Sequence, residues 1–147
     1  MVNPIDIEIA GWDISGLNLY DACRRAKVLE PSLIEQLKEQ LQAINPLPAA
    51  LTPEFIASNQ TDRADNVFQG TNSEIVAKLR SDIREMKAKT EKVILLWTAN
   101  TEQYLLPEIE TVEDLKRRIN GDAHLPSSIL YCVAAIEENI IYLNGSP

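Results

Sequence analysis

The feature that most constrains this chain is an apolar run that ends abruptly in small polar residues. Residues 92–103 read KVILLWTANTEQ, in which the apolar run Val93–Trp97 is followed at once by Thr98–Thr101. A second apolar run, Ile140–Leu143, lies near the end of the sequence and leads into Asn144–Ser146. Continuous apolar runs of this length are typical of parallel strands that are buried on both faces. We therefore expect both runs to be central strands of a parallel sheet.

Segments with helical spacing precede and separate these runs. Helices are expected to begin near Leu17, Pro31, Thr71, Thr111 and Pro126, because Thr71 and Glu74 have capping-box spacing and prolines favour the first turn. The helix from Pro31 should end at the prolines of Asn45–Pro48, and the last helix at Asn139. The apolar positions expected to face inward are Ile34, Leu37, Leu41, Ile44, Ile75, Leu79, Ile83, Met86, Leu115, Ile119, Ile129, Leu130, Val133 and Ile136.

The N-terminal segment has the period of a strand. Apolar and acidic residues alternate over Ile5–Ile9 and the pattern continues to Trp12, which predicts a strand with one buried face and Asp13 at its end. A shorter extended piece is expected around Phe55–Ala57. The order of strands and helices predicts an α/β fold, part of a Rossmann-type, doubly wound and mostly parallel sheet with helices on both faces. One domain is expected to cover residues 1–147.

Composition argues against several partners and compartments. The chain has 14 basic and 22 acidic residues, a formal net charge of −8. A protein that binds a phosphate-rich surface needs an excess of Lys and Arg, which this chain lacks. Neither a nucleic acid nor an anionic membrane is therefore expected as a partner. The sequence also lacks an apolar run of about 18–20 residues and the pattern of a secretory signal. We expect a cytoplasmic protein.

The chemistry available for catalysis is limited. Cys23 and Cys132 lie on apolar helical faces without metal-ligand spacing, which favours buried free thiols and predicts no metal site. His124 is the single histidine and has no partner visible in the sequence, so it offers little scope for acid–base catalysis. Glycine-rich phosphate-binding motifs are also missing from the sequence. The residues alone suggest part of a nucleotide-binding sheet without a catalytic centre.

Polar residues follow three of the expected strands. In open parallel sheets, ligands bind beyond the carboxyl ends of the strands, which is where Asp13, Thr98–Thr101 and Asn144–Ser146 would lie. Their short side chains suit ribose hydroxyls, phosphate oxygens or an amide. Small polar residues after strands are also ordinary turn residues. The pattern alone leaves a ligand edge and a set of turns both open.

Four motifs carry a resemblance to a known family. They are VNPIDIEIAGWDIS at 2–15, ASNQTDRADN at 57–66, KVILLWTANTE at 92–102 and LNGSP at 143–147. In this order and at similar separations, they resemble the myo-inositol-1-phosphate synthase family over essentially the whole chain. The resemblance implies an NAD-dependent isomerase that converts D-glucose 6-phosphate to 1L-myo-inositol 1-phosphate for inositol and phospholipid biosynthesis. It also implies a homotetrameric, cytoplasmic parent enzyme.

The resemblance assigns cofactor contacts but no catalytic residues. The positions that it assigns to NAD are Asp13, Gln60, Arg63, Thr98, Ala99, Asn100, Thr101, Gly145 and Ser146. Family members carry their glycine-rich NAD fingerprint upstream of this region and their catalytic lysines downstream of it. The chain therefore resembles an internal fragment that is inactive by itself. A stand-alone NAD-binding, nucleotide-binding or interaction module without catalysis is the alternative, and a flavodoxin-like domain would predict FMN instead.

Overall fold

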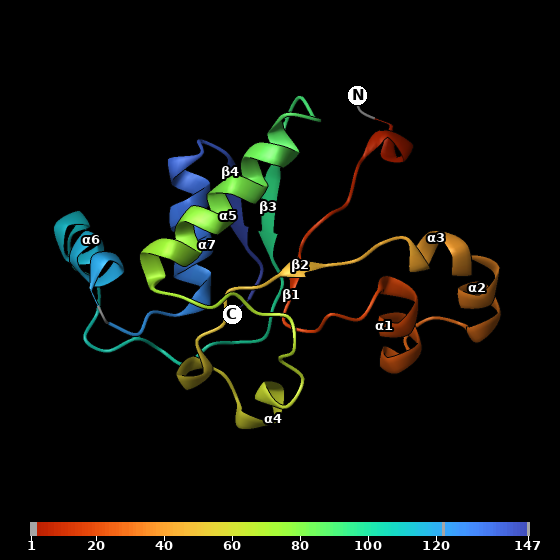
Figure 1. Ribbon diagram of the computed structural model, residues 1–147, viewed down its shortest axis with the longest axis horizontal. Helices are drawn as coiled ribbons and strands as arrows, with labels where there is room; N and C mark the ends of the chain where they lie inside the picture. Colours follow the sequence, from red (N-terminus) through yellow and green to blue (C-terminus); the bar gives the residue numbers. More distant parts are fainter. Residues whose placement is uncertain (1–2, 122, 147) are drawn as a thin grey trace. The chain divides into compact units, whose positions relative to one another are not determined.

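A computed structural model describes residues 3–121 and 123–146 of the chain, which forms two compact units (Figure 1). Unit 1 runs through Ala49 and includes Arg63–Val67, whereas unit 2 comprises Ala50–Asp62 and the chain from Phe68 onward. Within the described residues, the strands form two-stranded parallel sheets, β1–β2 in unit 1 and β3–β4 in unit 2. The predicted α/β fold with parallel strands is confirmed, while the single domain over 1–147 stays a prediction.

The described part of unit 1 contains a 3-10 helix, three short α-helices and a short pair of strands. Its elements are a 3-10 helix Pro4–Asp6, β1 Trp12–Asp13, α1 Leu19–Ala26, α2 Pro31–Gln36, α3 Lys38–Gln42 and β2 Leu47–Pro48. Trp12 lies opposite Leu47 and Asp13 opposite Pro48. The first helix begins where its sequence predicts, because the Asn18 side chain accepts a hydrogen bond from the Asp21 amide at 3.0 Å.

The predicted N-terminal strand is wrong except at its last residue, Trp12. The backbone over 7–11 is irregular, and Ile5 and Ile9 are 85% and 84% exposed. A 3-10 turn forms instead, in which the Asp6 amide donates to the Asn3 carbonyl at 2.9 Å. Alternating side chains need a paired neighbour and a covering layer to become a buried strand face. The partner strand β2 is 2 residues long and pairs only at Trp12 and Asp13.

The predicted helix from Pro31 is interrupted at Leu37, where φ is −100° and ψ is 11°. Ile34 is buried as expected, but Leu37 and Ile44 are exposed, so the predicted apolar stripe is only partly correct. The segment Leu47–Pro48, which was expected only to end the helix, forms β2. Its first amide donates to the Gly11 carbonyl at 2.8 Å, and the proline has no amide to leave unpaired.

Unit 2 contains the longer helices and the longer strands. Its elements are a 3-10 helix Pro53–Phe55, α4 Ser58–Thr61, α5 Asn72–Lys87, β3 Ile94–Trp97, α6 Val112–Asn120, α7 Ser127–Glu137 and β4 Ile141–Asn144. Both β strands begin one position later than predicted. The capping box of Thr71 and Glu74 is confirmed at the start of α5. Phe55 lies in a 3-10 helix rather than in an extended piece, whereas Ile56 and Ala57 have extended backbone.

The core of unit 2 lies where α5 packs on α7, which in turn contacts β4 (Figure 1). Leu79 and Ile83 on α5 are completely buried, and so is Ala134 on α7. Glu138, at the end of α7, accepts hydrogen bonds from the side chains of Arg80 and Arg84 on α5, both at 2.7 Å. These contacts connect the two helices at the surface of the core.

The expectation that both apolar strands are buried on two faces is wrong. Of the described residues of β3 and β4, Leu95 alone is buried, while its neighbours Ile94 and Leu96 are 54% and 56% exposed. Successive strand residues point to opposite faces, so helices packed on one face can bury only alternate positions. Ile136 on α7 is likewise exposed rather than inward-facing, and Cys132 is half-buried. The thiols of Cys23 and Cys132 are free, as predicted.

Candidate functional site

The candidate site of unit 2 lies at the carboxyl ends of β3 and β4. The parallel register pairs Trp97, the last residue of β3, with Asn144, the last residue of β4. Immediately beyond this pair, the Gly145 amide donates to the Trp97 carbonyl at 2.9 Å. The Ser146 hydroxyl donates to the carbonyl of Ala99. The structure therefore brings Gly145 and Ser146 beside the start of the segment that follows β3.

We call residues Thr98–Thr101 the edge loop. All of its side chains are exposed, in contrast with the half-buried Trp97 ring, which lies 5.3 Å from the Tyr131 ring of α7. The loop offers two hydroxyls and one amide, and each of these groups can both donate and accept hydrogen bonds. The edge loop is thus an exposed polar segment attached to a packed strand.

Gly145 meets a steric requirement at this edge. A Cβ atom at this position would lie 3.2 Å from the Trp97 carbonyl oxygen, which is closer than Cβ atoms normally approach. The absence of a side chain therefore lets the two strand ends come together and leaves space beside the edge loop.

The far end of the edge loop is held by contacts that the sequence did not indicate. The amide of Ser128 on α7 donates to both carboxylate oxygens of Glu102, at 3.3 Å and 3.2 Å. The next amide, that of Gln103, donates to the Phe55 carbonyl at 2.7 Å. Glu102 directly follows the TANT motif, and this position is the feature of the sequence that could have identified it as a site residue.

Two titratable groups of unit 2 have perturbed environments near these elements. The Tyr142 hydroxyl donates to the Ser128 carbonyl at 3.2 Å, and burial, with smaller contributions from Cys132 and Glu102, raises the pKa of Tyr142 to about 12. His124 does have a partner, because its Nδ1 lies 3.1 Å from Glu54 Oε1. The backbone hydrogen bond at Glu54, together with His124, lowers the pKa of that carboxyl group. Both members of this pair are exposed.

Unit 1 holds Asp13 and Arg63, two of the other predicted cofactor residues. Asp13 ends β1, is exposed, and accepts the Ser15 amide at 2.8 Å. The segment that carries the exposed Arg63 is attached to β1 by Asn66, whose side-chain amide donates to the carbonyls of Asp13 and Leu47, each at 3.1 Å. The structure thereby gathers the end of the N-terminal motif and the last four residues of NQTDRADN, Arg63–Asn66, within unit 1.

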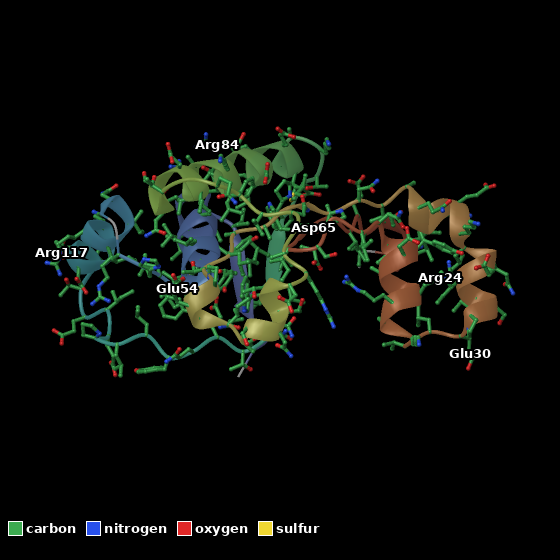
Figure 2. The ribbon with its side chains drawn as sticks, turned by 60° about the horizontal axis from the view of Figure 1, so that its bottom comes forward. Arg24, Glu30, Glu54, Asp65, Arg84 and Arg117 are labelled. Carbon is green, nitrogen blue, oxygen red and sulfur yellow. The ribbon has the colours of Figure 1, made fainter. Side chains whose placement is uncertain are left out.

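Asp65, labelled in Figure 2, supports the same arrangement by accepting the Gly16 amide at 2.8 Å. Neither Asp65 nor Asn66 was predicted as a site residue, although both lie in the quoted NQTDRADN motif. Gln60 belongs to unit 2, where it lies half-buried in α4. The predicted residues are therefore divided between the units, with Asp13 and Arg63 in unit 1 and the others in unit 2.

Comparison with known proteins gives a consistent result. The family described as myo-inositol-1-phosphate synthase, through its NAD-binding domain, matches residues 1–147. The chain belongs to this family. It is 47% identical to inositol-3-phosphate synthase 1 of Bos taurus and 46% identical to that of Populus euphratica. Both alignments cover 100% of this chain, but 27% and 30% of the respective relatives.

A solved structure agrees with this assignment. The crystal structure of inositol-3-phosphate synthase from Caenorhabditis elegans matches 99% of this chain at 44% identity and a TM-score of 0.91, over 30% of that protein. The chain thus spans about 30% of the length of such synthases. The predicted family, its Rossmann-type α/β fold and NAD as the family's cofactor are confirmed.

The residues at both strand edges fit this cofactor. NAD presents ribose hydroxyls, a carboxamide and a pyrophosphate, and the edge loop offers hydroxyl and amide groups of matching chemistry. Gly145 leaves room for close approach, and unit 1 offers the exposed carboxylate of Asp13 and the exposed guanidinium of Arg63. Along the described residues, no cluster of ligating side chains that could hold a metal ion is present, and no helix is long and apolar enough to cross a membrane.

Proposed function

We propose that this chain forms part of the NAD site of an inositol-3-phosphate synthase, an enzyme that converts D-glucose 6-phosphate to 1L-myo-inositol 1-phosphate. The observation that carries the proposal is the exposed edge loop at the carboxyl ends of two paired parallel strands, with Gly145 donating to the Trp97 carbonyl beside it. In parallel sheets this edge is where nucleotide ligands bind.

In this proposal, different residues of the chain contact different chemical groups of NAD. Asp13 accepts hydrogen bonds from ribose hydroxyls, and Arg63 offers charge to the pyrophosphate. The remaining contacts come from Gln60, Thr98, Ala99, Asn100, Thr101, Gly145 and Ser146. When bound, NAD supplies hydride chemistry, being reduced and then reoxidised. The residues of this chain bind and orient it.

The wider setting of the protein is also part of the proposal. The proposed parent enzyme is a cytoplasmic homotetramer that supports inositol and phospholipid biosynthesis, with this chain as one domain of it. Nucleic acid is not among its proposed partners, in keeping with the net charge of −8. The support is the family match and the identity of 44–47% to named synthases.

NAD binding is tested by thermal unfolding of the chain with and without the cofactor. NAD at ten times its Kd should add about 1.4 kcal/mol to the free energy of unfolding and raise the midpoint, whereas FMN should not. An Asn100→Ala chain should show a smaller rise. A thermal midpoint that does not change with millimolar NAD, or that rises equally with FMN, contradicts the proposal.

Synthase activity is a separate test. We propose that these 147 residues alone do not complete the reaction, since the groups at the strand edges are suited to binding a cofactor rather than to moving substrate protons. Expression in an inositol auxotroph should therefore not restore growth without inositol. Growth would show that the chain is itself a synthase, and binding of NAD without growth agrees with a binding segment.

A further inference from the structure

The edge loop is held at both of its ends. At the start, the Gly145 amide donates to the Trp97 carbonyl, and the Ser146 hydroxyl donates to Ala99. At the end, Glu102 receives the Ser128 amide. The polar side chains that would meet NAD therefore lie on a short arch between two fixed points.

The contact at Glu102 replaces a capping side chain of α7. The first amides of a helix lack partners inside the helix, and Ser128 carries one of them. Pro126 occupies the N-cap position, and its side chain cannot accept a hydrogen bond. The Glu102 carboxylate fills this role from 26 residues away, and a negative charge is favourable at a helix N-terminus.

The helix that Glu102 contacts, α7, is anchored in the core of unit 2. Leu130 and Ala134 of α7 are 1% and 0% exposed, so the helix is fixed in the core of unit 2. Its first residue, Ser127, is also buried and accepts the Thr52 amide at 3.1 Å. A loop that is tied to this helix end takes its position from the core.

We infer that Glu102 is a positioning residue for NAD, which holds the edge loop in its binding conformation by receiving the Ser128 amide at the N-terminus of α7. The inference rests on the proposed NAD site. Glu102 acts through the loop rather than by touching the cofactor. Loss of the contact lowers the fraction of chains whose loop is ready to bind, and the apparent Kd rises in inverse proportion to that fraction.

Two substitutions separate the reach of this side chain from its charge. Glu102→Asp keeps the carboxylate but shortens it by one methylene, and contacts already at 3.2–3.3 Å will not survive that change. Glu102→Gln keeps the length and an acceptor oxygen but removes the charge. The exposed Glu113→Asp on α6 is the matched control.

The measurements are the Kd for NAD by calorimetry and the hydrogen-exchange rate of the Ser128 amide by NMR, at a temperature where circular dichroism shows every variant folded. In E102D the Ser128 amide should exchange about tenfold faster and the Kd should rise about three- to tenfold. In E102Q the Ser128 exchange rate and the Kd for NAD should stay close to those of the parent chain. E113D should match the parent chain in both. A purely structural role for Glu102 would lower the thermal midpoint and leave the Kd unchanged.

The outcomes distinguish the inference from the function on which it rests. If E102D binds NAD as tightly as the parent chain, or if its Ser128 amide exchanges no faster, the positioning role is wrong while the NAD site stands. If the parent chain itself does not bind NAD, the proposed function is wrong and the inference falls with it. If E102D does not fold, E102Q decides: small rises in Ser128 exchange and in Kd must occur together, and a rise in one alone or in neither overturns the role.

Discussion

The two strand edges of this protein are built in different ways. In unit 2, β3 and β4 pair over 4 residues, and the helices α5 and α7 supply a buried core beside them. In unit 1, β1 and β2 pair over 2 residues, and Arg63–Val67 is joined to them by backbone hydrogen bonds at Asn66 and by the side chains of Asn66 and Asp65. The unit 2 edge thus has an apolar core behind its hydrogen bonds, whereas the unit 1 edge depends mainly on individual hydrogen bonds.

This difference has a physical consequence. Burial of apolar surface is non-directional, so the core of unit 2 tolerates small movements at its edge. A hydrogen bond depends steeply on geometry, and a buried group that loses its partner is costly. We therefore expect the stability of unit 2 to depend most on its apolar core, and that of unit 1 to depend more on single hydrogen bonds.

The largest expected effect comes from Leu79→Ala in α5. Leu79 is 0% exposed, and truncation of a buried leucine costs about 3–5 kcal/mol through lost burial and the cavity left behind. Urea unfolding followed by circular dichroism measures the loss. Leu96→Ala is the control, because Leu96 is 56% exposed and should cost less than about 1 kcal/mol. Equal losses in the two variants would contradict a core confined to one face of β3–β4.

A smaller effect is expected at Glu138, which joins α7 to α5. Hydrogen bonds from Arg84 and Arg80 lower the pKa of Glu138 below its usual value. Its contribution to stability is therefore present above the pKa of the unfolded carboxyl, about 4.3, and is lost as the pH falls through the lower folded pKa. Glu138→Gln should cost about 1–3 kcal/mol at pH 7.

Urea unfolding from pH 7 down to pH 2 tests this effect. The stability difference between the parent chain and E138Q should shrink as the pH falls below the folded pKa. Glu85→Gln, at an exposed position of α5, should show no such convergence. A difference that stays constant across the pH range would exclude the ion pairs as its cause.

Unit 1 is tested by Asn66→Ala, which removes the amide that donates to Asp13 and Leu47. The expected cost is about 0.5–1.5 kcal/mol, because two backbone carbonyls lose a donor at a site that water can partly reach. Hydrogen exchange should show faster exchange at the Leu47 amide, which donates to Gly11 across the strand pair. Amides of α5 should keep their rates, and the exposed Asn59→Ala serves as control. Faster amide exchange in α5 alone would contradict the dependence of unit 1 on the Asn66 hydrogen bonds.

The smallest effect on stability is expected at the edge loop itself. Asn100→Ala changes an exposed side chain, so the free energy of unfolding should move by less than about 0.5 kcal/mol. The NAD-induced rise in the thermal midpoint should nevertheless decrease. Asn120→Ala, also exposed, should leave that rise unchanged. A large loss of stability in N100A would show that the loop supports the fold rather than a ligand.

The helix starts and ends that are fixed by caps could be predicted because they depend on neighbouring residues, whereas the break at Leu37 could not. Thr71 and Glu74 complete their capping box within one turn, and Thr111 accepts the Asp114 amide at 3.1 Å. Asn139 ends the last helix with a φ of 55°, a left-handed conformation that asparagine adopts readily. Each of these interactions spans only a few residues, so the pattern is complete in the sequence.

Burial of the strands could not be predicted in the same way. The alternation of Ile5–Ile9 and the apolar run Val93–Trp97 both satisfy the patterns for buried strands, yet Ile9 and Leu96 are exposed. A pattern states which side chains could be covered, whereas covering them requires a neighbouring layer. Where α7 packs on one face, Leu95 is buried and the residues on either side of it are not.

The sequence by itself determined the family, the capped ends of α5, α6 and α7 and the polar residues that follow the strands, because each of these depends on a short contiguous motif. The tertiary structure decided which of those residues are held in place. Asn66 donates to Asp13 across 53 residues, and Ser128 donates to Glu102 across 26. Such bonds depend on how the backbone brings distant segments together, and no local pattern of side chains specifies that arrangement.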